Sequence, residues 1–245
     1  MGTVKNLTIT VDDNALEWAR IEAARRGSSV SRMVGDFLGE MQRREDAYER
    51  AYLAWSTDER TWRSAADGAK AGGAPAFALR SVCLARSGAG AGIEQPMQAL
   101  VTGALVFVDT SVLVAAEDTS AGALYAQVLD GLNHLWRGRT GRVSMQGLTE
   151  FYESVTGRGL NPMPQGDARA AIRRYNSWSP WQNDAATLET AWALQTRHAL
   201  AWGDCLALAA AQHSGCAALL SLHLPEGAQY GGVQVVRPEH LQGVV

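Results

Sequence analysis

Three carboxylates from residue 109 onward stand where chemistry is expected. Asp109 follows the apolar run LVFV, Glu150 lies four residues into a predicted helix, and Asp204 begins an otherwise apolar helix. Each position also has a structural explanation, as a strand-end turn former, a capping-box acid or a helix N-terminal acid. If the three meet at one sheet edge, their repulsion favours Mg²⁺ or Mn²⁺. Such an ion orients water and stabilises charge on a phosphodiester.

The elements around these acids predict an α/β domain. Apolar strand-like runs alternate with helical periodicity, which favours a parallel sheet with helices on both faces. The expected strands lie within 104–113, 142–145, 218–222 and 233–236. The expected helices lie near 121–136, 146–156, 167–175, 183–200 and 203–215.

The first 50 or so residues predict a small separate module. Residues 5–11, KNLTITV, alternate apolar and polar side chains with a period of two, which indicates a strand. Two helices are expected next, one ending at Gly27 and one beginning near Ser29. A module this small cannot bury a core by itself, so it must dimerise or pack on something else.

Residues 53–104 separate the two regions and predict a linker. Gly and Ala dominate stretches such as DGAKAGGAPAF and ARSGAGAGIEQP, which favours a flexible spacer. Embedded residues allow a second interpretation, a tail that wraps the α/β domain. In that interpretation an Arg neutralises the clustered acids and aromatic side chains anchor the tail. The candidate arginines and anchors are Arg60, Arg63, Arg80, Trp62 and Phe77.

Composition narrows the class of protein. The 245 residues are 47% hydrophobic and carry a net charge of -3, so a packed core is expected and a wholly basic nucleic-acid binder is not. The three cysteines have no CxxC spacing, as for reduced cytosolic thiols. We see no signal peptide and no apolar run long enough for a bilayer, and we expect a cytoplasmic protein without membrane association.

Four ordered segments resemble VapC-type PIN-domain toxins. They are FVDTSVLVAAED, LTEFYESVT, the run from HALAWGDC to LHLPEG, and YGGVQVVRP, which together span about 107–238. The resemblance implies a PIN-like α/β domain over 105–245 that acts as a magnesium- or manganese-dependent endoribonuclease on RNA. It assigns metal coordination and catalysis to Asp109, Glu150 and Asp204, with Thr110 and the adjacent Ser111 supporting the site.

One motif departs from the family pattern. Where the family usually has a strand-end SED sequence, this chain has Ser221-Leu222-His223. His223 therefore replaces the usual fourth acid as a potential metal ligand, and imidazole prefers softer cations than Mg²⁺. We expect the nuclease activity to be weakened or lost, unless Glu226 partly substitutes for the missing acid.

The N-terminal module, residues 1–52, resembles a ribbon-helix-helix antitoxin. In that family two chains pair their strands into a ribbon that enters the major groove of DNA. The resemblance implies a homodimer or higher even-numbered oligomer bound to operator DNA. The implied DNA-binding residues are Lys5, Asn6, Thr8, Thr10, Ser31 and Arg32. The competing interpretation is a generic oligomerisation module.

Together the two resemblances predict a fused toxin–antitoxin protein. Its PIN endoribonuclease is expected to be self-inhibited or weakened, beside a DNA-binding module. The alternative is a DNA-binding autorepressor that carries a catalytically inactive PIN scaffold. The chain also has eight tryptophans. For Trp178, Trp181 and Trp192 we favour core packing over stacking on RNA bases.

Overall fold

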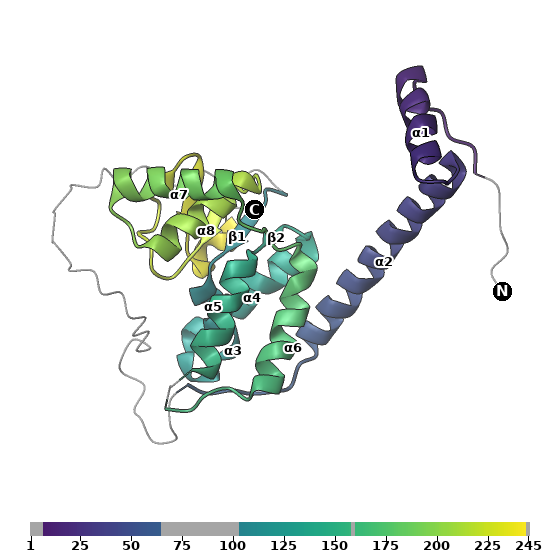
Figure 1. Cartoon of the computed structure of the whole chain (residues 1–245). Coiled ribbons are helices and arrows are strands. Elements are labelled where there is room, and N and C mark those ends of the chain that lie inside the picture. Colours follow the sequence, from purple (N-terminus) through teal and green to yellow (C-terminus); the bar gives the residue numbers. More distant parts are fainter. Residues whose placement is uncertain (1–6, 65–102, 158–159, 244–245) are drawn as a thin grey trace. The chain divides into compact units, whose positions relative to one another are not determined.

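The computed structural model describes residues 7–64, 103–157 and 160–243 (Figure 1). The chain divides into two compact units, residues 1–49 and 50–245. The boundary falls within the long helix α2 (Val30–Ser56), so the last two turns of that helix belong to the C-terminal unit.

The N-terminal unit consists of α1 (Asp13–Arg25) and the first part of α2. Asp12 caps α1, because its carboxylate accepts a hydrogen bond of 2.9 Å from the amide of Ala15. Gly27 follows α1 with φ +60°, the left-handed conformation that ends many helices. Residues 7–12 have no regular structure in the single chain, where the predicted strand has no partner to pair with.

The C-terminal unit contains a five-stranded sheet with the strand order β2-β1-β3-β5-β4. The strands β1 (Val106–Val108), β2 (Gly141–Arg142), β3 (Ala218–Leu220) and β5 (Val233–Val236) pair in parallel. The short edge strand β4 (Gln229–Tyr230) pairs antiparallel to β5. The mostly parallel sheet agrees with the predicted fold class.

Helices flank the sheet close to the predicted positions. They are α3 (Thr110–Glu117), α4 (Ala123–Gly138), α5 (Met145–Thr156), α6 (Gln165–Tyr175), α7 (Ala185–His198) and α8 (Trp202–His213). Three 3-10 helices, η1 (Thr119–Ala121), η2 (Asn176–Trp178) and η3 (Pro238–Gly243), complete the unit. Helix α3 was not predicted, because the six residues from Ser111 to Ala116 are all buried and no amphipathic stripe marks them.

The core lies on the sheet beneath α7 and α8. Phe107, Leu219 and Val235, from three adjacent strands, belong to one buried cluster with apolar residues of both helices. Side chains alternate along a strand, so Val106 and Val108 point to the opposite face, and both are buried there. The parallel strands thus end at one edge, where α3, α5 and α8 begin or end.

Among residues 7–64, 103–157 and 160–243, no helix is long and apolar enough to cross a bilayer.

Candidate active site

The three acids reach the carboxyl edge of the sheet from separate elements. Asp109 follows β1 and occupies the N-cap position of α3, with an extended backbone. Asp204 lies in the first turn of α8, and Glu150 lies in α5. A small pocket is lined by Asp109, Glu150 and Gly203, among others, so these segments meet at one place.

Hydroxyl and amide groups hold two of the acids in place. The Asp109 carboxylate accepts hydrogen bonds from the hydroxyls of Ser111 at 2.5 Å and Ser221 at 3.1 Å. Glu150 accepts one from the Thr110 hydroxyl at 3.0 Å and, through its other oxygen, one from the Gln146 side-chain amide at 2.6 Å. Thr110 therefore links the first acid's helix to the second acid.

Ser221 and Gln146 are site residues that the sequence analysis did not assign. Ser221 is fully buried at the end of β3, and its hydroxyl also accepts the backbone amide of His223 at 3.2 Å. Gln146 is held from outside by Asn183, whose side-chain amide donates to it at 2.8 Å. The sequence contained a signal for Ser221, because this residue directly follows a predicted strand, as Asp109 does. It contained no such signal for Gln146.

The surroundings of the Asp204 carboxyl shift its pKa upward. Burial raises the pKa of its carboxyl to about 6, and the negative charges of Asp109 and Glu150 push it the same way, whereas His223 lowers it. Like charges shift a pKa noticeably only over short distances. The four side chains that the sequence analysis grouped as metal ligands are therefore electrostatic neighbours.

A divalent cation matches the chemistry of these donors. Carboxylate oxygens suit Mg²⁺ and Mn²⁺, and a cation would relieve the repulsion that raises the pKa of Asp204. The arrangement is not a ready-made cage, because no three His, Cys, Asp or Glu side chains in the described parts of the chain lie close enough to hold an ion. Asp109 and Glu150 are instead engaged by their hydroxyl and amide partners.

The replaced motif leaves no acid in the fourth position. His223 is exposed and is the only titratable group that lowers the pKa of Asp204. The Glu226 carboxylate pairs with the ring of His240.

Replacing Asp204 is expected to stabilise the protein, although it removes one of the carboxylates that would bind a metal ion. The folded-state pKa is about 6 and the usual value is 3.8, so the folded protein binds more protons between these pH values and loses stability as the pH rises through them. Asp204→Asn removes that penalty. We expect its Tm at pH 7.5, in chelator, to exceed that of the wild type by roughly 2–4 °C, the shift for about 1 kcal/mol after solvent screening.

The pH dependence of Tm distinguishes this electrostatic effect from a change in stability that is unrelated to the charge of Asp204. Below pH 4 both proteins are neutral at this position, and their Tm values should agree. A variant that is less stable than the wild type at pH 7.5 would contradict the prediction that the ionised Asp204 carboxylate destabilises the folded protein.

The residues expected to contact DNA lie in the N-terminal unit. Lys5 and Asn6 fall outside the described residues, whereas Thr8, Thr10, Ser31 and Arg32 are all exposed. The Ser29 hydroxyl accepts the backbone amide of Arg32 at 3.2 Å at the start of α2. Among residues 7–49 only Ala23 is buried, and large apolar side chains are left in solvent. Those side chains are Leu7, Ile9, Val11, Trp18, Ile21, Phe37, Leu38 and Met41.

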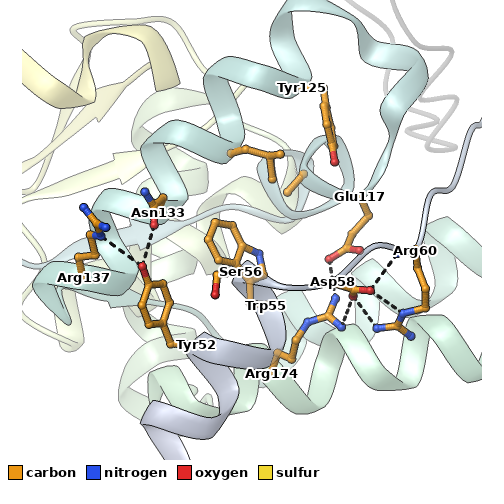
Figure 2. A pocket seen from close by; sticks show the side chains of 12 residues that line it. Tyr52, Trp55, Ser56, Asp58, Arg60, Glu117, Tyr125, Asn133, Arg137 and Arg174 are labelled. Atoms are coloured by element: carbon orange, nitrogen blue, oxygen red, sulfur yellow. Dashed lines mark hydrogen bonds and ion pairs between the residues drawn. The ribbon is translucent and has the colours of Figure 1, made fainter.

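Residues 50–64 pack against the rest of the C-terminal unit (Figure 2). Trp55 and Tyr52, at the end of α2, each lie with their ring centroids 6.1 Å from that of Trp136 in α4. The Tyr52 hydroxyl donates to the side chain of Asn133 at 3.0 Å and accepts from the guanidinium of Arg137 at 3.2 Å. We refer to residues 50–64 as the docked segment.

A chain of ion pairs continues this contact. Asp58 of the docked segment pairs with Arg174 of α6 at 2.6 Å, and Arg174 also pairs with Glu117 at 3.2 Å. Arg60 pairs with Asp58 at 2.6 Å and with Asp167 at 2.9 Å. Hydrogen bonding to Arg60 lowers the pKa of Asp58, whereas burial raises the pKa of Glu117. A cavity of about 520 Å³ is lined by Asp58, Arg60, Glu117 and Arg174, among others (Figure 2).

The end of the docked segment is fixed by backbone contacts. The Trp62 indole donates to the carbonyl of Asn161 at 2.9 Å, and the Trp62 carbonyl accepts the amide of Thr119 at 2.9 Å. The amide of Ser64 donates to Asp118 at 3.1 Å. Trp62 therefore anchors the segment, whereas Phe77 and Arg80 lie outside the described residues.

The docked segment contacts the end of α3 that is remote from the acids. Glu117 is the last residue of α3, and Asp109 caps its first turn, so about 12 Å of helix separates the two. Arg60 pairs with Asp58 and Asp167. The expectation that Arg60 neutralises the clustered acids is thus not met by this arrangement.

The comparisons with known proteins agree with the C-terminal fold. A family model of the PIN domain matches residues 106–222. A comparison of the chain with curated proteins found no match. The matched range begins at β1, includes all three acids and ends directly after Ser221. Residues 106–222 of this chain are therefore similar to the PIN domain, and they form an α/β fold with a mostly parallel sheet flanked by helices.

Proposed function

We propose that this chain is a fused toxin–antitoxin protein whose PIN domain is a metal-dependent endoribonuclease. The observation that carries the proposal is the raised pKa of Asp204, because it marks three acids of a PIN domain crowded at one sheet edge. Acids in such a position repel the phosphates of RNA unless a cation is bound. A bound cation neutralises the acids and attracts the phosphate groups.

The residues have separate roles in this proposal. Asp109, Glu150 and Asp204 would hold Mg²⁺ or Mn²⁺, and the ion would supply an oriented water and charge neutralisation at the phosphodiester. Ser111 and Ser221 fix the Asp109 carboxylate, while Thr110 fixes Glu150. His223 supplies no negative charge where the family has an acid, which supports weakened activity.

The N-terminal unit is proposed to dimerise and bind operator DNA. Among residues 7–49 only Ala23 is buried and many large apolar side chains are exposed, so this part of the unit has no core of its own. Pairing of the segments around Leu7–Val11 from two copies would bury part of that surface and turn Thr8 and Thr10 toward the major groove. A homodimer or a larger even-numbered assembly follows from such pairing.

The proposal includes restraint of the nuclease by the chain itself. The docked segment, residues 50–64, supports a tail-like role, because it packs on the PIN domain as an antitoxin tail does in the family that it resembles. Its described contacts lie at the far end of α3. The described contacts of the docked segment therefore do not reach the acids.

The decisive experiment measures RNA cleavage. The full chain and residues 50–245 are incubated with single-stranded RNA and Mg²⁺ or Mn²⁺, beside Asp109→Asn, which removes one negative charge from the site. We expect cleavage in Mn²⁺ that the variant lacks. Cleavage that is faster for residues 50–245 would place a restraint in the first 49 residues.

One observation favours a second function. The missing acid at His223 and the engaged state of Glu226 suit a DNA-binding autorepressor with an inactive PIN scaffold. Absence of cleavage from a folded protein with either metal, together with sequence-specific DNA binding by the full chain, would select this alternative.

A further inference from the structure

Two tryptophans of the C-terminal unit, Trp192 and Trp202, lie on the surface, and for Trp192 this differs from the prediction. The side chain of Trp192 is 49% exposed and that of Trp202 is 37% exposed, whereas Trp136 and Trp178 are 1% exposed in the core. Core packing was thus correct for Trp178 and wrong for Trp192. The two exposed indoles stack, with ring centroids 6.5 Å apart and planes inclined by 22°. Burying either ring would be favourable, so leaving both in water calls for a function.

The pair borders the acid site. Trp202 is the first residue of α8, two residues before Asp204. A side chain added at the intervening Gly203 would come within 3.7 Å of a Glu150 carboxylate oxygen, so this turn of α8 lies against the acids. An object bound at the acids therefore passes close to the Trp202 indole.

The end of α7 supplies positive charge beside the same place. Arg197 and His198 occupy its last turn and are exposed, and α7 connects to Trp202 through only three residues. The ring of His198 packs edge-on against Tyr230 at 5.0 Å, and the charge of Asp204 contributes to the raised pKa of Tyr230. The Arg197 guanidinium thus places a positive charge near the indoles, as binding of a phosphate backbone would require.

We propose that Trp192 and Trp202 form a stacking subsite for unpaired bases of the RNA next to the cleavage site; the inference rests on the proposed nuclease function. Indole faces stack on any base, and only an unpaired base can offer its face to them. The planes of the two rings are nearly parallel, as those of successive stacked bases in a strand are. The subsite deepens the proposed function by selecting single-stranded RNA over duplex.

The test measures binding separately from cleavage. Fluorescence anisotropy of a labelled eight-nucleotide oligouridylate is followed at low salt with the full chain carrying Asp109→Asn, in Mg²⁺, so that RNA stays intact. Trp192→Ala and Trp202→Ala are expected to weaken binding roughly 10- to 100-fold, the loss of one stacked base. Trp202→Phe, which keeps a stacking face, should recover most of the affinity.

Trp18→Ala is the matched control, because Trp18 is 63% exposed but lies in the N-terminal unit. It should leave RNA binding unchanged, and a blunt RNA duplex of equal length should bind weakly and without dependence on Trp192 or Trp202. Unchanged binding by both alanine variants, or no RNA binding by the parent, would overturn the subsite.

The remaining outcomes separate this inference from its rivals. Tryptophan-dependent binding without cleavage by the parent chain that retains Asp109 would support the subsite and reject the nuclease. A change of oligomeric state in the alanine variants, with RNA affinity preserved, would show that the pair is an interface between copies and would overturn the subsite.

Discussion

Removing residues 50–64 is expected to lower the free energy of unfolding of the C-terminal unit by roughly 3–5 kcal/mol, the loss measured when a buried ion pair is broken by removing one partner. Deletion takes Asp58 away from Arg174, which is only 6% exposed. It also uncovers the face of Trp136 against which Tyr52 and Trp55 pack. The domain would then keep its sheet but lose the contacts that residues 50–64 make with its helices.

The comparison uses two fragments that differ only in the docked segment, residues 50–245 and residues 65–245. Denaturant unfolding followed by circular dichroism gives the free energy of each, and the shorter fragment should have the lower transition midpoint. The full chain and residues 50–245 should agree in the transition of the C-terminal unit. Equal midpoints for the two fragments would show that the docked segment contributes nothing to stability.

Arg174→Ala is expected to cost a similar roughly 3–5 kcal/mol, because it removes the buried cation between Asp58 and Glu117 and leaves only the half-exposed Arg60 beside Asp58. Arg174 pairs with Asp58 at 2.6 Å and with Glu117 at 3.2 Å. Burial already raises the pKa of Glu117, so protonation of this group limits the cost. The loss should therefore shrink as the pH is lowered and both carboxylates become neutral.

Arg60→Ala is the matched control for this prediction. Arg60 shares Asp58 with Arg174, but its side chain is 42% exposed, so its ion pairs are screened by solvent. We expect a loss below about 1 kcal/mol. Thermal and urea unfolding of both variants at pH 7.5 and pH 5 measure the difference. Similar losses for the two arginines would contradict the assignment of the buried pair to Arg174.

Helix α3 connects these two predictions to the proposed chemistry. Its first turn is capped by Asp109, and its last residue is Glu117, which the docked segment reaches through Arg174. The contacts that stabilise the domain and the acids that would hold metal are thus at opposite ends of one buried helix. Changes in the docked segment should alter stability more than they alter the geometry of the acids.

The sequence by itself determined the elements and the positions of the acids along them. Apolar periodicity is a local property, so it located α7, α8, β3 and β5 to within a few residues. Parallel strands end at the same edge of a sheet, and this rule indicated that Asp109, Glu150 and Asp204 would gather. The PIN family match covers the same region.

Only the tertiary structure decided which side chains meet across long separations. The pairing of Asp58 with Arg174 joins residues more than a hundred positions apart, and no periodicity encodes it. The exposure of Trp192 likewise depends on what packs over α7, not on its place within the helix. Ser221 and Gln146 join the acid site for the same reason, because a hydroxyl or amide is committed by the neighbour that the fold supplies.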